Sequence, residues 1–187
     1  MSQGNGAEGV SEVMEFFSHA DAFAASFLLE ANDFPFPVDQ LSGLNRSFNV
    51  FFDLRAHYGR FRALVAWQSS ESTQPVETVE ELVVSFPNEE FAIAFLSEEQ
   101  ERLLKIGTPI DDLGPLGEQS IVVGFEEISE YSPSTYTIYC SIRKSIAVIR
   151  LTAVINTEDL AEIPFDAIAN LLKKAVQKLD NGILLKV

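Results

Sequence analysis

The stretch Phe48–Trp67, FNVFFDLRAHYGRFRALVAW, contains the clearest local pattern in this chain of 187 residues. Its first part alternates apolar and polar residues as far as Leu54. Its second part has one apolar parity, formed by Phe61, Ala63, Val65 and Trp67. A period of two is typical of a strand with one buried face. The link Ala56–Gly59 is short and contains glycine, so the two runs predict a β-hairpin.

The regions on either side of this hairpin also show regular patterns. Residues 12–30 have helical spacing of apolar side chains, and the proline-containing segment 34–45 is expected to be a loop. A third strand is predicted over 77–86. Pro87 then opens a helix over 87–106, because proline suits the first helical position. Gly107 is expected to end that helix as its C′ residue.

The second half of the chain repeats this order. Strands are predicted over 120–127, 135–143 and 145–155, with a tight turn at 143–145, and Pro164 opens a last helix that ends near Asp180. The order α-βββα-βββα, with short hairpins, predicts an α+β fold with a single antiparallel sheet covered by helices. The two βββα halves suggest an internal duplication. We expect residues 1–10 to be a flexible tether and residues 11–187 to form one domain.

Charge and composition exclude several classes of protein. The chain has 13 basic and 28 acidic residues, a net charge of −15, which argues against nucleic-acid binding. No apolar run approaches the roughly 18–20 residues of a membrane-spanning helix. One cysteine, Cys140, excludes an internal disulfide framework and a multi-cysteine zinc site.

The sequence contains no recognisable catalytic arrangement. Cys140 shares its strand parity with Ile138 and Ile142, so we expect it to be buried and unreactive. The two histidines are His19 and His57. Adjacent acids such as Glu80-Glu81 and Glu98-Glu99 point in different directions on a strand or helix, so we expect them on solvated faces. The sequence predicts a protein that is not an enzyme and has no metal site or cofactor.

Basic side chains are scarce in this acidic chain and gather near two hairpins. Arg143, Lys144 and Arg150 flank the last hairpin. The first hairpin supplies the predicted ligand-binding site, which consists of Arg55, His57, Tyr58, Arg60 and Trp67. Arginine, tyrosine and tryptophan are the residue types that most often dominate contact sites, and the positive charge would favour an anionic ligand or partner. The alternative is that Trp67 packs in the core and the arginines pair with the protein's own carboxylates.

Several segments carry a resemblance to a known family. They are CSIRKSIAVIRLTAV (Cys140–Val154), AIANLLKKAVQKL (Ala167–Leu179), SFPNEEFAIAFL (Ser85–Leu96) and SFLLEANDFP (Ser26–Pro35). Together they resemble the extracellular sensor domains of mycobacterial-type serine/threonine kinases and related cell-envelope lipoproteins. In the kinase sensors the cysteine forms a disulfide, whereas Cys140 has no second cysteine to pair with. The resemblance implies an antiparallel sheet with helices, an extracytoplasmic location and a binding role without catalysis.

We therefore expect a non-catalytic extracytoplasmic binding or sensor module, on a lipoprotein whose signal peptide precedes residue 1 in the gene. A lipid anchor at the N-terminus would be its attachment to the membrane, and its partner is an unidentified small ligand or protein. The acidic composition and the lone cysteine also fit the cytoplasm. The alternative is accordingly an intracellular partner-binding protein that resembles a type III secretion chaperone.

Overall fold

The computed structural model describes residues 26–52, 57–111, 113, 116–127, 134–156 and 163–181. Side-chain positions within β1, β2 and their hairpin are described only up to Leu41 and again from Arg62. The elements in chain order are η1 (Ala31–Asp33), β1 (Val38–Phe52), β2 (His57–Ser69), β3 (Val76–Ser85), α2 (Glu89–Leu103), β4 (Thr108–Pro109), β5 (Gln119–Glu127), β6 (Thr135–Lys144), β7 (Ala147–Asn156) and α3 (Phe165–Asn181).

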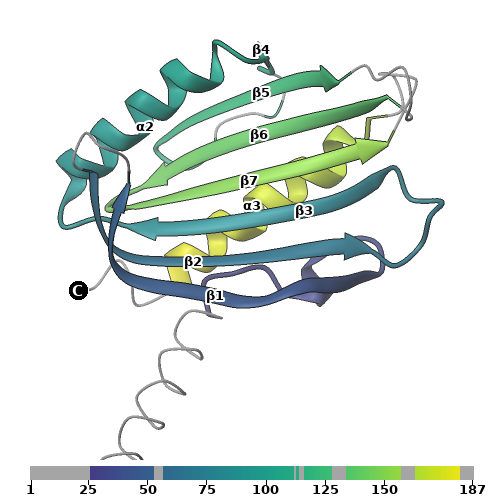
Figure 1. The fold of residues 1–187 in the computed structure, drawn as a ribbon, viewed down its shortest axis with the longest axis horizontal. Helices are drawn as coiled ribbons and strands as arrows, with labels where there is room; N and C mark the ends of the chain where they lie inside the picture. The colour runs from purple at the N-terminus through teal and green to yellow at the C-terminus, as the bar shows by residue number, and fades with distance from the viewer. Residues whose placement is uncertain are drawn as a thin grey trace, which may run out of the picture.

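The strands form one seven-stranded sheet in the order β1-β2-β3-β7-β6-β5-β4, and every neighbouring pair is antiparallel (Figure 1). The predicted hairpin is present, since Phe48 pairs with Phe61 and Phe52 with His57 across β1 and β2. The predicted α+β class with a single antiparallel sheet is confirmed. The third strands of the two halves, β3 and β7, meet at the centre of the sheet.

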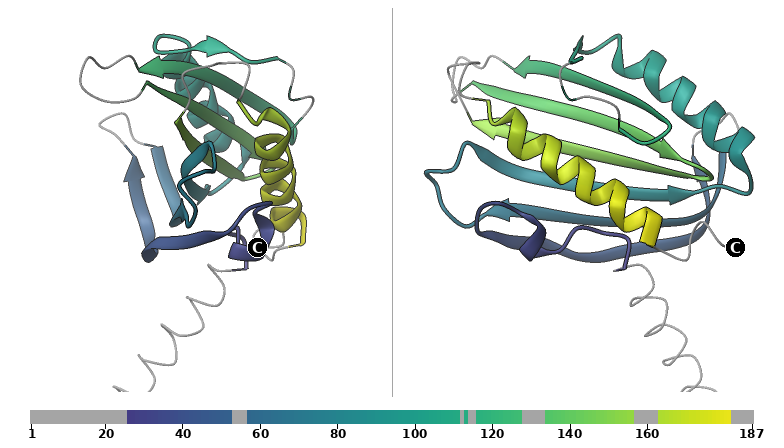
Figure 2. Two further views of the ribbon diagram at one scale, coloured as in Figure 1. Left: turned by 90° about the vertical axis from the view of Figure 1, so that its right-hand side faces the viewer. Right: turned by 180° about the vertical axis from the view of Figure 1, so that it is seen from behind.

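The two helices pack on opposite faces of the sheet. On the back face, seen in the right-hand view of Figure 2, α3 lies across the strands. Its buried side chains join the larger core, which includes Ile168, Leu171, Leu172 and Leu179 of α3 and Val65, Val83, Ile149 and Leu151 of the strands. On the front face, α2 contributes Ala92, Phe95 and Leu96 to a smaller core with Leu82, Val84, Phe86 and Val148. Alternate residues of β3 and β7 therefore serve different cores.

The position of the helices does not support the suggested internal duplication. Neighbouring antiparallel strands are related by a dyad normal to the sheet, and a rotation about that dyad leaves each face unchanged. A duplication related by the dyad between β3 and β7 would put α2 and α3 on the same face. They lie on different faces.

The structure corrects several predicted boundaries near the N-terminus. Residues 26–30 form a turn and extended backbone and not the end of a helix, and the rest of the predicted helix 12–30 lies outside the described residues. The predicted loop 34–45 is wrong in its second part, because β1 begins at Val38. Register shifts near Ser42 interrupt the period of two, which hides this strand in the sequence. His57–Gly59, predicted as turn, belongs to β2.

The ends of α2 also differ from the prediction. The N-cap is Asn88, whose Oδ1 accepts a hydrogen bond of 3.1 Å from the N–H of Phe91, so Pro87 precedes the helix. The helix ends at Leu103, and Gly107 does not have the positive φ expected of a C′ glycine. Gly107 is required instead by a close approach, because a Cβ there would lie 2.8 Å from the carbonyl oxygen of Gly124. The short strand β4 was not predicted.

The turn between β6 and β7 is displaced from its predicted place. Arg143 and Lys144 belong to β6 and pair with Val148 and Ala147 of β7. The turn consists of Ser145 and Ile146, and Ser145 has a φ of 51°. The predicted last helix, 164–180, closely matches α3.

Candidate functional site

The structure places one residue of the predicted hairpin site, Trp67, far from the hairpin turn. Trp67 lies ten residues along β2 from His57, which is about 30 Å along an extended strand. The indole ring is buried on the back face, with 8% of the residue exposed, and its centroid lies 5.5 Å from that of Phe34. Arg55 lies outside the described residues, and the side chains of His57, Tyr58 and Arg60 are not described. Trp67 is therefore a core residue, and the other four positions stay a prediction.

The basic residues near the last hairpin pair with the protein's own polar groups. Arg143 Nη1 lies 2.8 Å from Glu118 Oε2, and Arg143 Nε donates a hydrogen bond of 2.8 Å to Gln119 Oε1. The same guanidinium donates to the carbonyl oxygen of Ser145 in the turn. Arg143 therefore fastens the β6–β7 turn to the start of β5, which is a structural role.

A second group of arginines lies on the front face, around a buried carboxylate. Glu99 of α2 is 8% exposed, so the expectation that its acid pair is solvated is wrong for this residue. Glu99 Oε1 lies 2.9 Å from Arg150 Nε on β7 and 2.8 Å from Arg102 Nη2, and Arg102 Nε donates to Glu99 Oε2 over 3.1 Å. Hydrogen bonding to Glu99 raises the pKa of the Arg102 guanidinium. The carboxylate thus joins α2 to the middle of the sheet.

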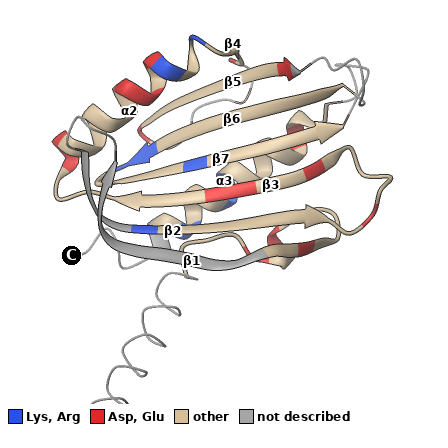
Figure 3. Cartoon of the chain, viewed as in Figure 1, with Lys and Arg blue, Asp and Glu red and all other residues tan. Residues whose placement is uncertain are grey.

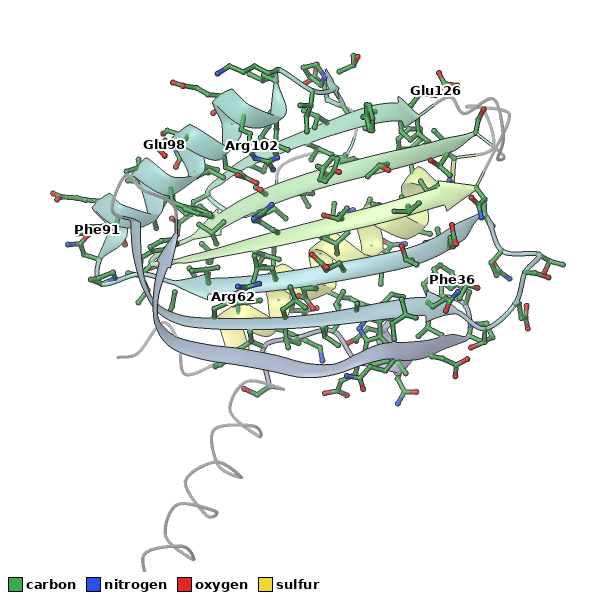
Figure 4. All side chains as sticks on the ribbon, in the orientation of Figure 1. Phe36, Arg62, Phe91, Glu98, Arg102 and Glu126 are labelled. Atoms are coloured by element: carbon green, nitrogen blue, oxygen red, sulfur yellow. The ribbon has the colours of Figure 1, made fainter. Side chains whose placement is uncertain are left out.

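This arrangement leaves positive charge on the front face. We call Arg62, Arg102 and Arg150, with Glu99 between the last two, the front-face arginine cluster. Arg62 on β2 is half-buried, faces the same side of the sheet as Leu64, and makes no ion pair within the described part of the chain. Figure 3 shows where the basic residues lie along β2, β7 and α2, and Figure 4 labels Arg62 and Arg102.

The neighbouring side chains on the front face are mostly polar. Glu80 of β3 is exposed on the same side of the sheet, and α2 carries Glu89, Glu90, Glu98 and Glu101 besides Glu99, so the three arginines are a local group of positive charges on a face that is otherwise acidic. Tyr139 and Thr152 pair across β6 and β7 and are half-buried beside Arg150. Guanidinium groups flanked by hydroxyls are suited to binding carboxylate or phosphate oxygens. This cluster is the strongest candidate site among the described residues. The sequence pattern placed Arg62 with the first hairpin and Arg150 with the last, and it did not single out Arg102.

Two other features carry less information. A shallow cleft of about 330 Å³ lies at the turn between β2 and β3, where Gln68, Glu71, Gln74 and Asn156 are among its polar lining residues. Cys140 is buried, as predicted, and burial raises the pKa of its thiol far above the ordinary range.

Within the described ranges, no group of three histidine, cysteine or acidic side chains could hold a metal ion, and no helix is long and apolar enough to cross a membrane.

Comparisons with known proteins bear on the fold. No family model and no curated protein matches the chain. Among solved structures, the extracellular domain of PknH from Mycobacterium tuberculosis has a similar fold, with a TM-score of 0.57 and 10% sequence identity. The likeness covers 82% of this chain and 94% of that domain. The fold expected from the family resemblance is therefore confirmed, and at this identity the likeness establishes the fold alone.

Proposed function

We propose that this domain is a non-catalytic extracytoplasmic binding or sensor module, carried by a cell-envelope lipoprotein. The observation that supports it is the fold similarity to the extracellular domain of PknH, which extends over 94% of that domain. A match of this extent includes the whole arrangement of sheet and helices and not one supersecondary motif. Fold similarity does not by itself determine function, so the site must be tested on its own residues.

The proposed contact surface is the front-face arginine cluster, and the proposed ligand is an anion with carboxylate or phosphate groups. Arg150 engages Glu99 through Nε, and the two terminal nitrogens of its guanidinium form no ion pair within the described part of the chain. The three guanidinium groups form a local concentration of positive charge in a chain with a net charge of −15, and this local charge would favour an anion at the cluster. The predicted hairpin residues Arg55, His57, Tyr58 and Arg60 remain a proposed extension of this surface.

The location can be tested with thiol labelling, because the single native cysteine is buried. Thr73→Cys places a thiol at an exposed position between β2 and β3, in protein expressed from its full gene in its own host. We expect a membrane-impermeant maleimide to label this variant in intact cells, with wild type and a Thr73→Cys, Cys140→Ala double variant as controls. Labelling that requires cell lysis would contradict the proposal and favour the intracellular alternative.

Ligand binding can be tested by NMR titration with inorganic phosphate and with succinate. We expect amide shifts on β2, β7 and α2, and a dissociation constant that rises about 5–10-fold in Arg150→Gln or Arg62→Gln. The effect should shrink with added salt. Lys173→Gln is the matched control, because Lys173 is exposed on α3, on the opposite face. Equal weakening by Lys173→Gln, or no shifts on the front face, would contradict the proposed contact surface.

A further inference from the structure

The back face of the sheet contains a fully buried carboxyl group that no proposed function uses. Glu81 of β3 is 0% exposed, although the adjacent acids Glu80-Glu81 were expected to be solvated. Its partners across the ladder are Val65 on β2 and Leu151 on β7, which are apolar. Glu81 Oε2 accepts a hydrogen bond of 2.6 Å from the backbone N–H of Leu29, and Oε1 has no hydrogen-bond partner among the described residues. A buried polar atom without a hydrogen-bond partner raises the free energy of the folded state, so a state in which water reaches that atom becomes more favourable.

The segment that covers Glu81 comes from the N-terminal side of the sheet. Residues 27–34 contribute Phe27, Leu28, Leu29 and Phe34 to the larger core, beside α3. Phe34 packs against Trp67, whose Nε1 is the other buried side-chain atom without a hydrogen-bond partner among the described residues. Trp67 is a diagonal neighbour of Glu81 across β2 and β3, since Val65 pairs with Glu81. One segment therefore contacts both residues that have an unsatisfied buried atom.

The outer edge of this segment is held by ionic contacts to α3. Lys178 Nζ lies 3.0 Å from Asp33 Oδ2 and 3.3 Å from Glu30 Oε1, and Lys174 Nζ donates to the carbonyl oxygen of Asp33. Lys178 and Asp33 are also the charged groups that act on Glu81, with opposite signs. The neighbouring strands add none, because Val65 and Leu151 face Glu81 there. Burial raises the pKa of Glu81 to about 8, against the opposing effects of the Leu29 N–H and Lys178.

We propose that residues 27–34 form a proton-dependent clasp, which stays docked on the back face while Glu81 is neutral and is released when Glu81 is ionised. A neutral carboxyl leaves one weakly polar oxygen unpaired under the clasp, whereas a carboxylate would place a full charge in an apolar core. Opening the clasp admits water to the carboxylate and to the indole N–H of Trp67 together. Acid conditions therefore keep residues 27–34 docked, and alkaline conditions release them. This inference is independent of the proposed function.

Hydrogen exchange of the Leu29 amide tests the clasp directly, because this N–H donates to Glu81. The exchange rate of this amide, corrected for the intrinsic exchange rate, gives the equilibrium constant for opening of the clasp. This constant should rise tenfold per pH unit from about pH 4.5 to about pH 8 and then level off. The Leu29 amide must also be less protected than the amide of Ile149 in the core, since a clasp opens without global unfolding. Equal protection of the two amides, or pH-independent opening in wild type, overturns the proposal.

Two variants separate Glu81 from other titrating groups. Glu81→Gln keeps the shape and removes the charge, and we expect opening that does not depend on pH in this range. Glu80→Gln is the matched control, because Glu80 lies on the opposite face of the same strand, and it should keep the tenfold slope. The single tryptophan gives a second readout, because opening exposes Trp67 and moves its emission to longer wavelength. A Glu81→Gln variant that keeps the wild-type slope overturns the proposal, and if it does not fold, the wild-type measurements decide.

Discussion

Glu99 on α2 and Arg150 on β7 form an ion pair of 2.9 Å between Oε1 and Nε, beneath a helix whose other contacts with the sheet are mainly apolar. The carboxylate is 8% exposed and also binds Arg102, so its hydrogen-bonding capacity is used within the protein. The sequence places Glu99 one residue after Glu98 in an acidic run. The structure shows that the second acid holds the helix in place.

We expect Glu99→Ala to destabilise the domain by about 1–3 kcal/mol, because Arg150 would lose its counter-ion in a partly buried place. Urea denaturation measures the change in the free energy of unfolding. Glu101→Ala, on the exposed side of the same helix, should change it by less than about 0.5 kcal/mol. Equal effects in the two variants would show that the Glu99 contacts contribute little.

Cys140 is expected to be inert in the native protein. Its thiol is 2% exposed between β5 and β7, and burial raises its pKa, so the reactive thiolate does not form at neutral pH. Cys140→Ala should cost about 1 kcal/mol or somewhat more, through loss of a small buried group. Labelling by a thiol reagent should require unfolding. Rapid labelling of the folded protein would contradict this prediction.

Gly124 on β5 is required by the ring of Tyr136 on β6. An ideal Cβ at Gly124 would lie 1.7 Å from Tyr136 Oη and 2.4 Å from Cζ, so the ring packs over a backbone without a side chain. We expect Gly124→Ala to destabilise the domain by roughly 1–3 kcal/mol, because the ring must move out of its packed position. Thermal denaturation measures the effect. In a Tyr136→Ala background the same substitution should be nearly neutral, and an unchanged penalty there would exclude the ring as its cause.

The fold could be predicted wherever local patterns agree with burial. The alternation after Phe61 placed Val65 and Trp67 on one face, and the structure buries both. The alternation of apolar and polar residues fails in the first part of β1. Register shifts around Ser42 change which face of the sheet successive side chains lie on. Helix ends were displaced by a few residues, since Asn88 caps α2 with its side chain although Pro87 carries the stronger sequence signal.

The candidate site was less predictable, because it depends on contacts between distant parts of the chain. Arg150 and Glu99 are 51 positions apart, and Leu29 reaches Glu81 across 52. Adjacent acids suggested solvated faces, yet Glu81 shares its parity with the buried Val79 and Val83. That parity was visible in the sequence, and it was the signal that could have identified a buried carboxyl group. No local pattern indicated which segment would cover it.

The contacts of Asp33 stabilise the clasp less in strong acid, and this effect is separate from the ionisation of Glu81. Burial tends to raise the pKa of Asp33, but the N–H of Glu30 and the ammonium of Lys178 outweigh it, so the pKa lies below the ordinary 3.8. A lowered pKa in the folded state stabilises the protein above the unfolded value, and this contribution is lost as the pH falls through the folded value. Asp33→Asn should therefore be less stable than wild type near neutral pH, by about 0.5–1 kcal/mol for a partly exposed pair, and the difference should vanish as the pH falls through the lowered pKa of Asp33 in the folded state. Urea denaturation across this range, with Asp39→Asn as the control at an exposed position on β1, measures it. A difference that persists in strong acid would mean that the substitution acts through packing and not through the charge of Asp33.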